Sequence, residues 1–443
     1  MSRDSPPVSA SRGLALDAVM LCALKLALGA WVLKLGFSHV SDDDYARTVI
    51  AEQFALAPRL DPSGTSWLPL PFWLEGSAMM AAGRSLGVAR AVALTLGTAS
   101  VCAPYLAMRW ARIPRAAALI ACTVAMALPW NAWLSVATVP EGWSGALVAA
   151  AAIAMGRAGA EPLAAAALTV ASLSRYEAWP TCAMLATVCI GRATREASPW
   201  RNGAWALIAM AGPIGWMAWN AHAHGNALHF LTRVSAFRHA IGAADVPERA
   251  KLLGYPLALV QETPEAAVLG IAGATGMLRS GVLRARWQMA AVVAAAIVAF
   301  LVFGDLRDTA PTHHPARALA AVWWILISMG LDAVVHEVRG AASSGVRLVA
   351  SGAAALLAIA WCAWLPARWS AAPGRSESER RDAQIAHGVD LRSRHVSRAI
   401  ITPCAFEHFA LIAAWGEPER AEVGGRTGEP SSEDCPRIVE QGP

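Results

Sequence analysis

Charged side chains are scarce in this chain of 443 residues. Asp, Glu, Lys and Arg together make up 16% of it, against about 25% in an average soluble domain. Hydrophobic residues account for 56%, and the mean hydropathy of +0.41 reflects apolar residues spread along the whole chain. This composition excludes an ordinary soluble enzyme and predicts an all-α, polytopic integral membrane protein.

Lysine is almost absent, with 3 Lys beside 34 Arg, and the net charge is only +5. The arginines are scattered through short connectors and form no basic block of the kind that binds nucleic acid. DNA and RNA are therefore excluded as partners. The bias toward Arg is typical of a GC-rich bacterium, which favours location in a bacterial inner membrane.

The cysteines show no metal-binding spacing. Six of the eight lie inside apolar stretches, where a free thiol behaves as a small hydrophobic group. Cys404 and Cys435 are the two in the polar C-terminal region. They form a candidate disulfide if that region is exported.

No removable signal peptide is evident. The polar segment Met1–Arg12 precedes an apolar run that continues to Phe37 without a small-residue cleavage site. We therefore expect this run to be retained as the first membrane span.

A helix needs about 20 apolar residues to cross a bilayer, and shorter crossings are tolerated when neighbours shield their ends. The sequence predicts about eleven crossings on this basis. They are Gly13–Phe37, Arg90–Met108, Ala116–Ala137, Gly142–Gly156, Pro162–Ser174, Ala178–Gly191, Gly203–Asn220, Pro256–Met277, Trp287–Gly304, Ala318–Val335 and Leu348–Pro366.

Arg-rich connectors predict the orientation of these spans. All of them can be cytoplasmic at once if the N-terminus is cytoplasmic, which places the intervening loops and the C-terminal region outside. The segment Pro71–Leu86 is apolar enough to cross, but a full crossing there would reverse every later connector. We expect it to be membrane-embedded, with its path left open.

The composition shifts near residue 367. We therefore divide the chain into a membrane domain, 1–366, and a linker with a small exported α/β-like C-terminal domain, 367–443. Within the latter, Ile400–Trp415 and Pro418–Val423 fit a strand, a helix and a second strand.

The first outer loop begins with three adjacent acids, Asp42, Asp43 and Asp44. Apolar residues at helical spacing follow them, which predicts an amphipathic helix on the membrane surface. Ser41 with Asp44 resembles a capping box, so capping accounts for one or two of the acids. Since adjacent carboxylates repel one another, we expect the cluster to supply a general base or a cation site.

Two further outer turns carry charges close to apolar runs. Glu141 directly precedes one predicted span, where a glutamate at a helix N-terminus is commonplace, and Arg175, Tyr176 and Glu177 lie between two others. Charges at the depth of Arg175 and Glu177 usually line a cavity. Mutual neutralisation of Arg175 and Glu177 is the equally weighted alternative.

The loop 305–317 contains His313, His314 and Arg317 just before a predicted span. Side chains of these types donate hydrogen bonds to phosphate oxygens. Zinc is the alternative ligand, but adjacent histidines lack the usual spacing, even with His222 and His224 available. A phosphate site is favoured.

These features resemble the GT-C class of polytopic glycosyltransferases, especially the protein O-mannosyltransferase and aminoarabinose-transferase type. That class carries a paired-acid motif in the first outer loop, matched here by Asp43 and Asp44 or by Asp42 and Asp43. The surface helix, the number of spans and the exported C-terminal domain agree with the same plan over roughly Gly13–Pro366. The third Asp and the unassigned C-terminal domain depart from it.

The resemblance implies a transferase that moves a sugar from a polyprenyl-phosphate donor to an acceptor on the outer face, with inversion at the anomeric carbon. Asp43 would be the general base, and Asp44 and Asp42 would complete the catalytic set. The expected phosphate-binding residues are Arg175, His313, His314 and Arg317.

Glu141, Tyr176 and Glu177 would position the acceptor or the sugar. No cofactor is required by this chemistry, although Asp42, Asp43 and Asp44 together could hold a divalent metal ion. The expected partners are the donor lipid, the bilayer and an acceptor of unidentified class: glycan, lipid or protein.

Two other functions fit parts of the sequence. A transporter or lipid flippase would use the intramembrane charges as a permeation route, but no internal repeat relates the two halves. A non-catalytic membrane scaffold would use the acids only to cap a helix. The identity of the sugar and of the acceptor lies beyond what the sequence specifies.

Overall fold

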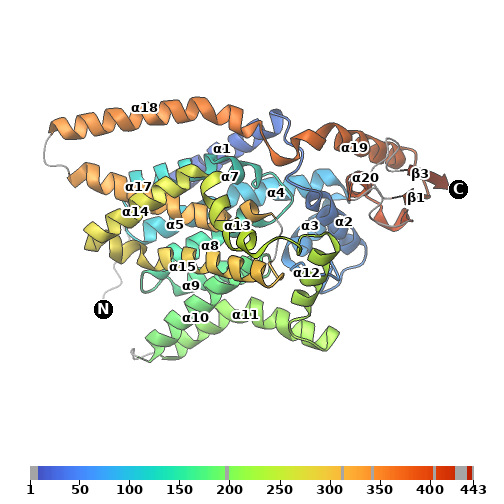
Figure 1. Ribbon diagram of the computed structural model, residues 1–443, viewed down its shortest axis with the longest axis horizontal. Helices are drawn as coiled ribbons and strands as arrows, with labels where there is room; N and C mark the ends of the chain where they lie inside the picture. The colour runs from blue at the N-terminus through green and yellow to red at the C-terminus, as the bar shows by residue number, and fades with distance from the viewer. Residues whose placement is uncertain are drawn as a thin grey trace.

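The computed structural model describes residues 8–194, 199–310, 314–340, 344–402, 406–424 and 437–441. Helices dominate this part of the chain, and a small sheet lies near the C-terminus (Figure 1). Three residues of the sequence-based predictions lie outside the described residues: Cys404 and Cys435 of the candidate disulfide, and His313 of the expected phosphate site.

The first half of the membrane domain is a series of apolar helices joined by short turns. Their bounds are α1 Val8–Lys34, α2 Asp43–Leu56, α3 Leu70–Ala82, α4 Leu86–Ser100, α5 Cys102–Trp110, α6 Arg115–Ala127, α7 Pro129–Trp133, α8 Glu141–Met155, α9 Glu161–Ser172, η1 Tyr176–Ala178 and α10 Trp179–Ala193.

The second half continues in the same way to the edge of the C-terminal region. Its helices are α11 Pro199–His224, α12 His229–Ala240, α13 Glu248–Gln261, α14 Pro264–Arg279, α15 Gly281–Leu306, α16 Pro315–Ala318, α17 Ala320–Gly340 and α18 Ser344–Trp369.

Four stretches of the described residues are long and apolar enough to cross a membrane: Gly13–Lys34, Leu86–Trp110, Gly281–Leu306 and Ala320–Gly340. The protein is therefore an integral membrane protein. Helix α8 lies at the centre of the bundle, where nearly all of its residues are buried against α5, α9 and α17. Small side chains, mostly alanine, allow the close packing that membrane helices use.

Prolines divide two of the predicted spans. The expected continuous crossing Pro256–Met277 is wrong as a single helix, because Pro264 starts a new helix and separates α13 from α14. In the same way Pro129 separates α6 from α7 within the expected span Ala116–Ala137. Proline lacks the N–H needed to continue a helix and favours its first turn.

Helix α2 begins within the run of three aspartates, as the sequence predicts, with Asp43 as its first residue, but it does not simply lie on a membrane surface. Its apolar residues Ala46 and Val49 are buried, and the helix packs on α3 and on the C-terminal helix α20 (His408–Trp415). The expectation of a lipid-facing helix is corrected, because protein covers this face instead.

The C-terminal region contains the predicted strand, helix and strand. After η2 (Pro373–Glu377) and α19 (Ser378–Ser393), the order is β1 Arg398–Thr402, α20, η3 Pro418–Arg420, β2 Ala421–Val423 and β3 Arg437–Gln441. Strand β1 is central, pairing in parallel with β2 (Ala399 opposite Ala421) and antiparallel with β3 (Ile400 opposite Val439).

This C-terminal unit lies beside α2 and α3 at one end of the molecule (Figure 1). Tyr45 and Val49 of α2 share a buried apolar cluster with Leu391, Leu411 and Trp415. The unit therefore shares its core with the helix that follows the Asp motif.

Candidate functional site

Arg317 is the centre of a buried ion-pair cluster. It lies on the short helix α16, and its relative exposure is 1%. Its Nη1 atom donates to Asp43 Oδ2 and to Ser41 Oγ, both at 2.8 Å. Its Nε and Nη2 atoms donate to Glu141 Oε1 at 2.9 and 2.6 Å. One guanidinium thus joins the loop that follows α1 to the start of α8.

Arg175 extends the same cluster. Its Nη1 atom lies 3.3 Å from Glu141 Oε1, and its Nη2 and Nε atoms donate to Glu177 at 2.6 and 3.1 Å. Arg175 and Glu177 do neutralise each other, as the sequence allowed. Glu141 bridges Arg175 and Arg317 through Oε1, and all three side chains line a second small cavity.

The three adjacent aspartates point to three different sets of partners. Asp43 faces Arg317. Asp44 accepts backbone N–H bonds from Val40 at 3.1 Å, Ser41 at 3.3 Å and Thr138 at 2.9 Å. Its carboxylate therefore closes the first turn of α2 and fastens it to the turn before α8, as the acid of a capping box does.

Asp42 is the residue that precedes the first turn of α2, and its side chain makes no capping bond. It accepts hydrogen bonds from Arg381 of α19 instead, at 2.8 and 3.0 Å. Asp42, Asp43 and Asp44 consequently do not converge on one point. The three-oxygen metal site considered from the sequence is not assembled by these residues.

Arg47 is a site residue that the sequence analysis did not single out. It is 2% exposed, and its guanidinium lies over the rings of Trp67 and Phe72, at 4.3 and 5.6 Å. Its Nε and Nη1 atoms have no hydrogen-bond partner among the described residues. The sequence did contain one signal for Arg47. It lies four residues after Asp43, and residues i and i+4 share a face of a helix.

Arg47 differs from the other buried arginines of the described chain. Arg175, Arg238, Arg317 and Arg381 each have a carboxylate within 4 Å. Among the described residues, no carboxylate comes that close to Arg47. A buried cation without a counter-ion is costly, and such a group is suited to receive an anion.

The unpaired guanidinium borders a small cavity. The cavity is also lined by Arg175, Ser174, Tyr176, Ser66, Trp67, Leu68 and Val234. Its volume of about 10 Å³ holds a single water molecule. Arg47 and Arg175 thus face the same space, and a larger ligand would require the lining side chains to move.

Electrostatics separate Asp43 from Asp44. Burial alone would raise the pKa of Asp43, but Arg317 and Arg47 outweigh it and lower that pKa to about 2. Burial dominates at Asp44 and raises its pKa. Burial also lowers the pKa of Arg47 to about 10. Asp43 is therefore firmly ionised while Arg317 holds it.

Two further predicted site residues, His314 and Tyr176, lie in different surroundings. His314 directly precedes α16, and its electrostatic interaction with Asp43 is a minor cause of the lowered pKa of Asp43, after burial, Arg317 and Arg47. The Tyr176 hydroxyl donates to the Ser66 carbonyl at 2.7 Å and accepts from Trp216 Nε1 at 3.1 Å. Its ring stacks on Phe230, with centroids 4.8 Å apart. Tyr176 thus fixes the wall of the cavity.

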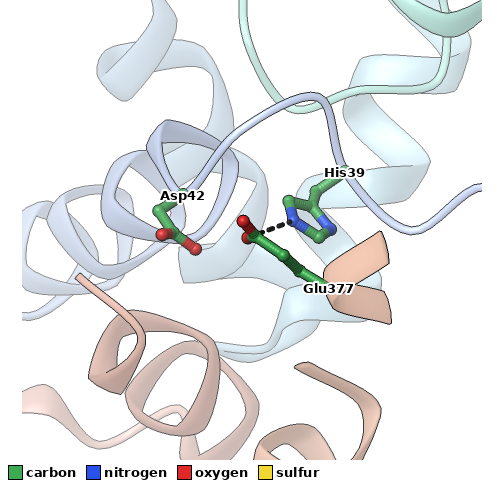
Figure 2. A group of neighbouring side chains, drawn as sticks. All are labelled: His39, Asp42 and Glu377. Atoms are coloured by element: carbon green, nitrogen blue, oxygen red, sulfur yellow. Dashed lines mark ion pairs between the residues drawn. The ribbon is translucent and has the colours of Figure 1, made fainter. Parts of the chain in front are cut away.

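A different set of metal-ligating side chains does gather nearby. His39, Asp42 and Glu377 place one potential ligand atom each within 4.8 Å of one another (Figure 2). The guanidinium of Arg381 contacts both carboxylates, at 2.8 Å from Asp42 Oδ1 and 3.0 Å from Glu377 Oε2. The positive charge that a metal ion would supply is already provided there by Arg381.

The fold matches that of known glycosyltransferase structures. The crystal structure of ArnT from Cupriavidus metallidurans bound to undecaprenyl phosphate aligns with a TM-score of 0.58 at 14% identity, over 91% of this chain and 89% of ArnT. Its apo structure aligns with a TM-score of 0.56 at 14% identity, over 94% and 90%. ArnT is an aminoarabinose transferase of the GT-C class, so the expected GT-C fold is confirmed. No protein-family model and no curated protein sequence matches this chain.

Proposed function

We propose that this GT-C-fold chain is a membrane glycosyltransferase that uses a polyprenyl-phosphate-linked sugar as donor. One observation carries the proposal: an ionised Asp43 and an unpaired Arg47 lie four residues apart on α2, with Arg175 and Arg317 beside them. A carboxylate beside surplus guanidinium groups suits a reaction that removes one proton and releases one phosphate. The solved ArnT structure bound to undecaprenyl phosphate supports the same class of lipid.

Arg47 and Arg175 are the proposed donor phosphate ligands. Both border the same cavity, and guanidinium groups match phosphate oxygens in charge and geometry. Arg317 is held by Asp43 and Glu141. It would therefore bind the phosphate only if the phosphate displaced one of these carboxylates from its guanidinium. His314 would add positive charge from the residue that precedes α16.

The reaction proceeds by direct displacement. Asp43 accepts the proton of an acceptor hydroxyl or amine, whose oxygen or nitrogen forms a bond to the anomeric carbon. The bond from that carbon to the phosphate oxygen breaks, and its electron pair leaves with the polyprenyl phosphate. The anomeric configuration inverts, and the guanidinium groups stabilise the charge that develops on the phosphate.

Donor binding also prepares Asp43 as a base. A carboxylate whose pKa is about 2 accepts a proton poorly near neutral pH. A donor phosphate beside Arg47 and Arg175 adds negative charge near Asp43 and competes for Arg317. Both effects raise the pKa of Asp43 in the donor complex. The base therefore becomes effective only when the donor is present.

The orientation follows the arginine distribution: we propose a cytoplasmic N-terminus and an external site, periplasmic if the host is a bacterium. The donor lipid would then enter from the outer leaflet. The acceptor is a glycan, a lipid or a protein on that side.

The first experiment measures binding of undecaprenyl phosphate to the purified protein in nanodiscs. Native protein is expected to bind, and Arg47→Gln is expected to bind at least tenfold more weakly, because the unpaired cation is lost. Arg157→Gln is the matched control, since Arg157 donates to the Trp110 carbonyl outside the cluster. The melting temperature of Arg47→Gln should change little, because the loss of the ring contacts with Trp67 and Phe72 is offset by the removal of a buried cation that no described carboxylate contacts. Absence of binding by the native protein, or equal binding by Arg47→Gln, would overturn the proposal.

A further inference from the structure

We infer that Arg381, in the C-terminal unit, is a positioning residue for Asp43. The inference rests on the proposed function, because it assigns Asp43 the role of base. Arg381 lies on α19 and Asp43 on α2, yet a continuous set of contacts through Asp42 connects them. The C-terminal unit would thereby take part in transfer without touching the donor.

Arg381 is bound by three carboxylates. Its exposure is 2%. Its Nε and Nη2 atoms form a fork on the two oxygens of Asp42, at 2.8 and 3.0 Å. Nη2 also donates to Glu377 Oε2 at 3.0 Å, and Nη1 lies 3.2 Å from Glu407 Oε1. Figure 2 shows Glu377 reaching between Asp42 and His39 from the C-terminal segment. A guanidinium held on so many sides has a single orientation.

Asp42 links the fixed guanidinium of Arg381 to the first turn of α2. Its backbone carbonyl accepts the N–H groups of Tyr45 and Ala46, at 3.1 and 3.0 Å. Its side chain makes no capping bond within the helix. The backbone of Asp42 therefore starts the helix while its carboxylate is held by Arg381. Asp43 is the next residue, so the direction of its carboxylate depends on how this first turn is held.

Neighbouring contacts make the junction rigid. A Cβ atom at Gly374 would lie 2.6 Å from the His39 carbonyl oxygen, so only glycine fits there. Arg375 Nη1 donates to the Leu35 carbonyl at 2.9 Å, at the end of span α1. The segment that leads into α19 is thus fastened to the loop that leads into α2.

The C-terminal unit also contacts the other side of the cavity. The rings of Phe237 on α12 and Phe406 lie with centroids 6.4 Å apart, and Val234 of α12 lines the cavity with Arg47. The unit thus bridges two elements that border the candidate phosphate site. Its contact with α2 is polar and specific, whereas its contact with α12 is an exposed aromatic pair.

The first test measures hydrogen–deuterium exchange and requires no substrate. In Arg381→Gln, peptides that cover 40–47 are expected to exchange at least fivefold faster, while peptides from α8 and α17 remain unchanged. Asp42→Asn should reproduce the effect from the other partner. Arg394→Gln is the control, because it removes two exposed ion pairs, to Asp390 and Glu440, at the residue that follows the end of α19. Unchanged exchange in a folded Arg381→Gln protein overturns the inference; if that variant fails to fold, Arg381→Lys and Asp42→Asn decide.

The second test measures turnover as release of undecaprenyl phosphate from undecaprenyl-phosphate hexoses and pentoses in the presence of native membrane extract. Arg381→Gln is expected to lower kcat at least tenfold with the donor KM within twofold, because contacts that do not involve Arg381 hold the donor ligands: Arg47 on the rings of Trp67 and Phe72, and Arg175 on Glu141 and Glu177. In an Asp43→Asn background, Arg381→Gln should lower the residual rate by less than twofold. An equal tenfold loss in both backgrounds overturns the inference. If the native protein shows no turnover, the proposed function fails, and the exchange experiment still decides the role of Arg381.

Discussion

Arg317 donates a hydrogen bond to Asp43 at 2.8 Å, although 274 residues separate them in the sequence. The bond joins the start of α2 to the short helix before α17, on one side of the membrane bundle. Because Glu141 holds the same guanidinium from α8, the orientation of Asp43 depends on three separate segments of the chain. Several measurable consequences arise from this arrangement.

Replacing Asp43 by Asn should abolish turnover while the fold is retained. Asparagine has nearly the same shape and does not act as a base, and Arg317 keeps Glu141 as its counter-ion. We expect a loss of at least about 10²-fold in kcat, within the usual contribution of general base catalysis, measured as release of undecaprenyl phosphate. A thermal melt checks the fold. Retained turnover in Asp43→Asn would exclude the proposed role.

The pH dependence of turnover should differ between the free enzyme and the donor complex. Arg317 and Arg47 overcome the effect of burial and hold the pKa of free Asp43 at about 2, and kcat/KM reports groups of the free enzyme. Protonation of Asp43 should therefore reduce kcat/KM only below about pH 3. The acid limb of the kcat profile should lie at a higher pH than the acid limb of kcat/KM, because the donor phosphate raises the pKa of Asp43. Coincident acid limbs in the two profiles would argue against activation by the donor.

The two glutamates of the cluster should differ in their effect on stability. Glu141→Gln removes the charge shared by two buried arginines, and breaking such a pair costs about 3–5 kcal/mol. Glu177→Gln should cost less, because Arg175 keeps its contact with Glu141. Thermal melts of the two variants in the same detergent provide the comparison. A larger destabilisation by Glu177→Gln would contradict the assigned bridging role of Glu141.

Glu52 should make the protein less stable as the pH rises. Both of its carboxylate oxygens are buried and have no hydrogen-bond partner among the described residues, and burial raises its pKa well above the ordinary 4.5. Above pH 4.5 the unfolded state loses this proton while the folded state keeps it, so stability falls until the folded pKa is reached. Glu52→Gln should therefore raise the melting temperature more at pH 8 than at pH 5. An equal shift at both values would show that Glu52 does not titrate in this range.

The sequence by itself determined the membrane class, the presence of a helix with the three aspartates at its start and the strand-helix-strand order of the C-terminal unit. These properties depend on composition, local periodicity and turn residues, which act over a few neighbouring positions. It also indicated that Glu141, Arg175 and Arg317 belong together. Charges beside apolar runs are costly, and such groups gather where they neutralise one another.

Tertiary structure alone decided which partner each of these groups has. Nothing local distinguishes Asp42, Asp43 and Asp44, yet one binds Arg381, one binds Arg317 and one binds backbone N–H groups. The burial of Arg47 on Trp67 and Phe72, with no contacting carboxylate among the described residues, and the packing of α20 on α2 likewise depend on contacts between distant segments. Side chains hundreds of residues apart acquire their charge environment only when the chain folds. Tertiary contacts, and not the local sequence, therefore distinguish the proposed base Asp43 from the residues that support it.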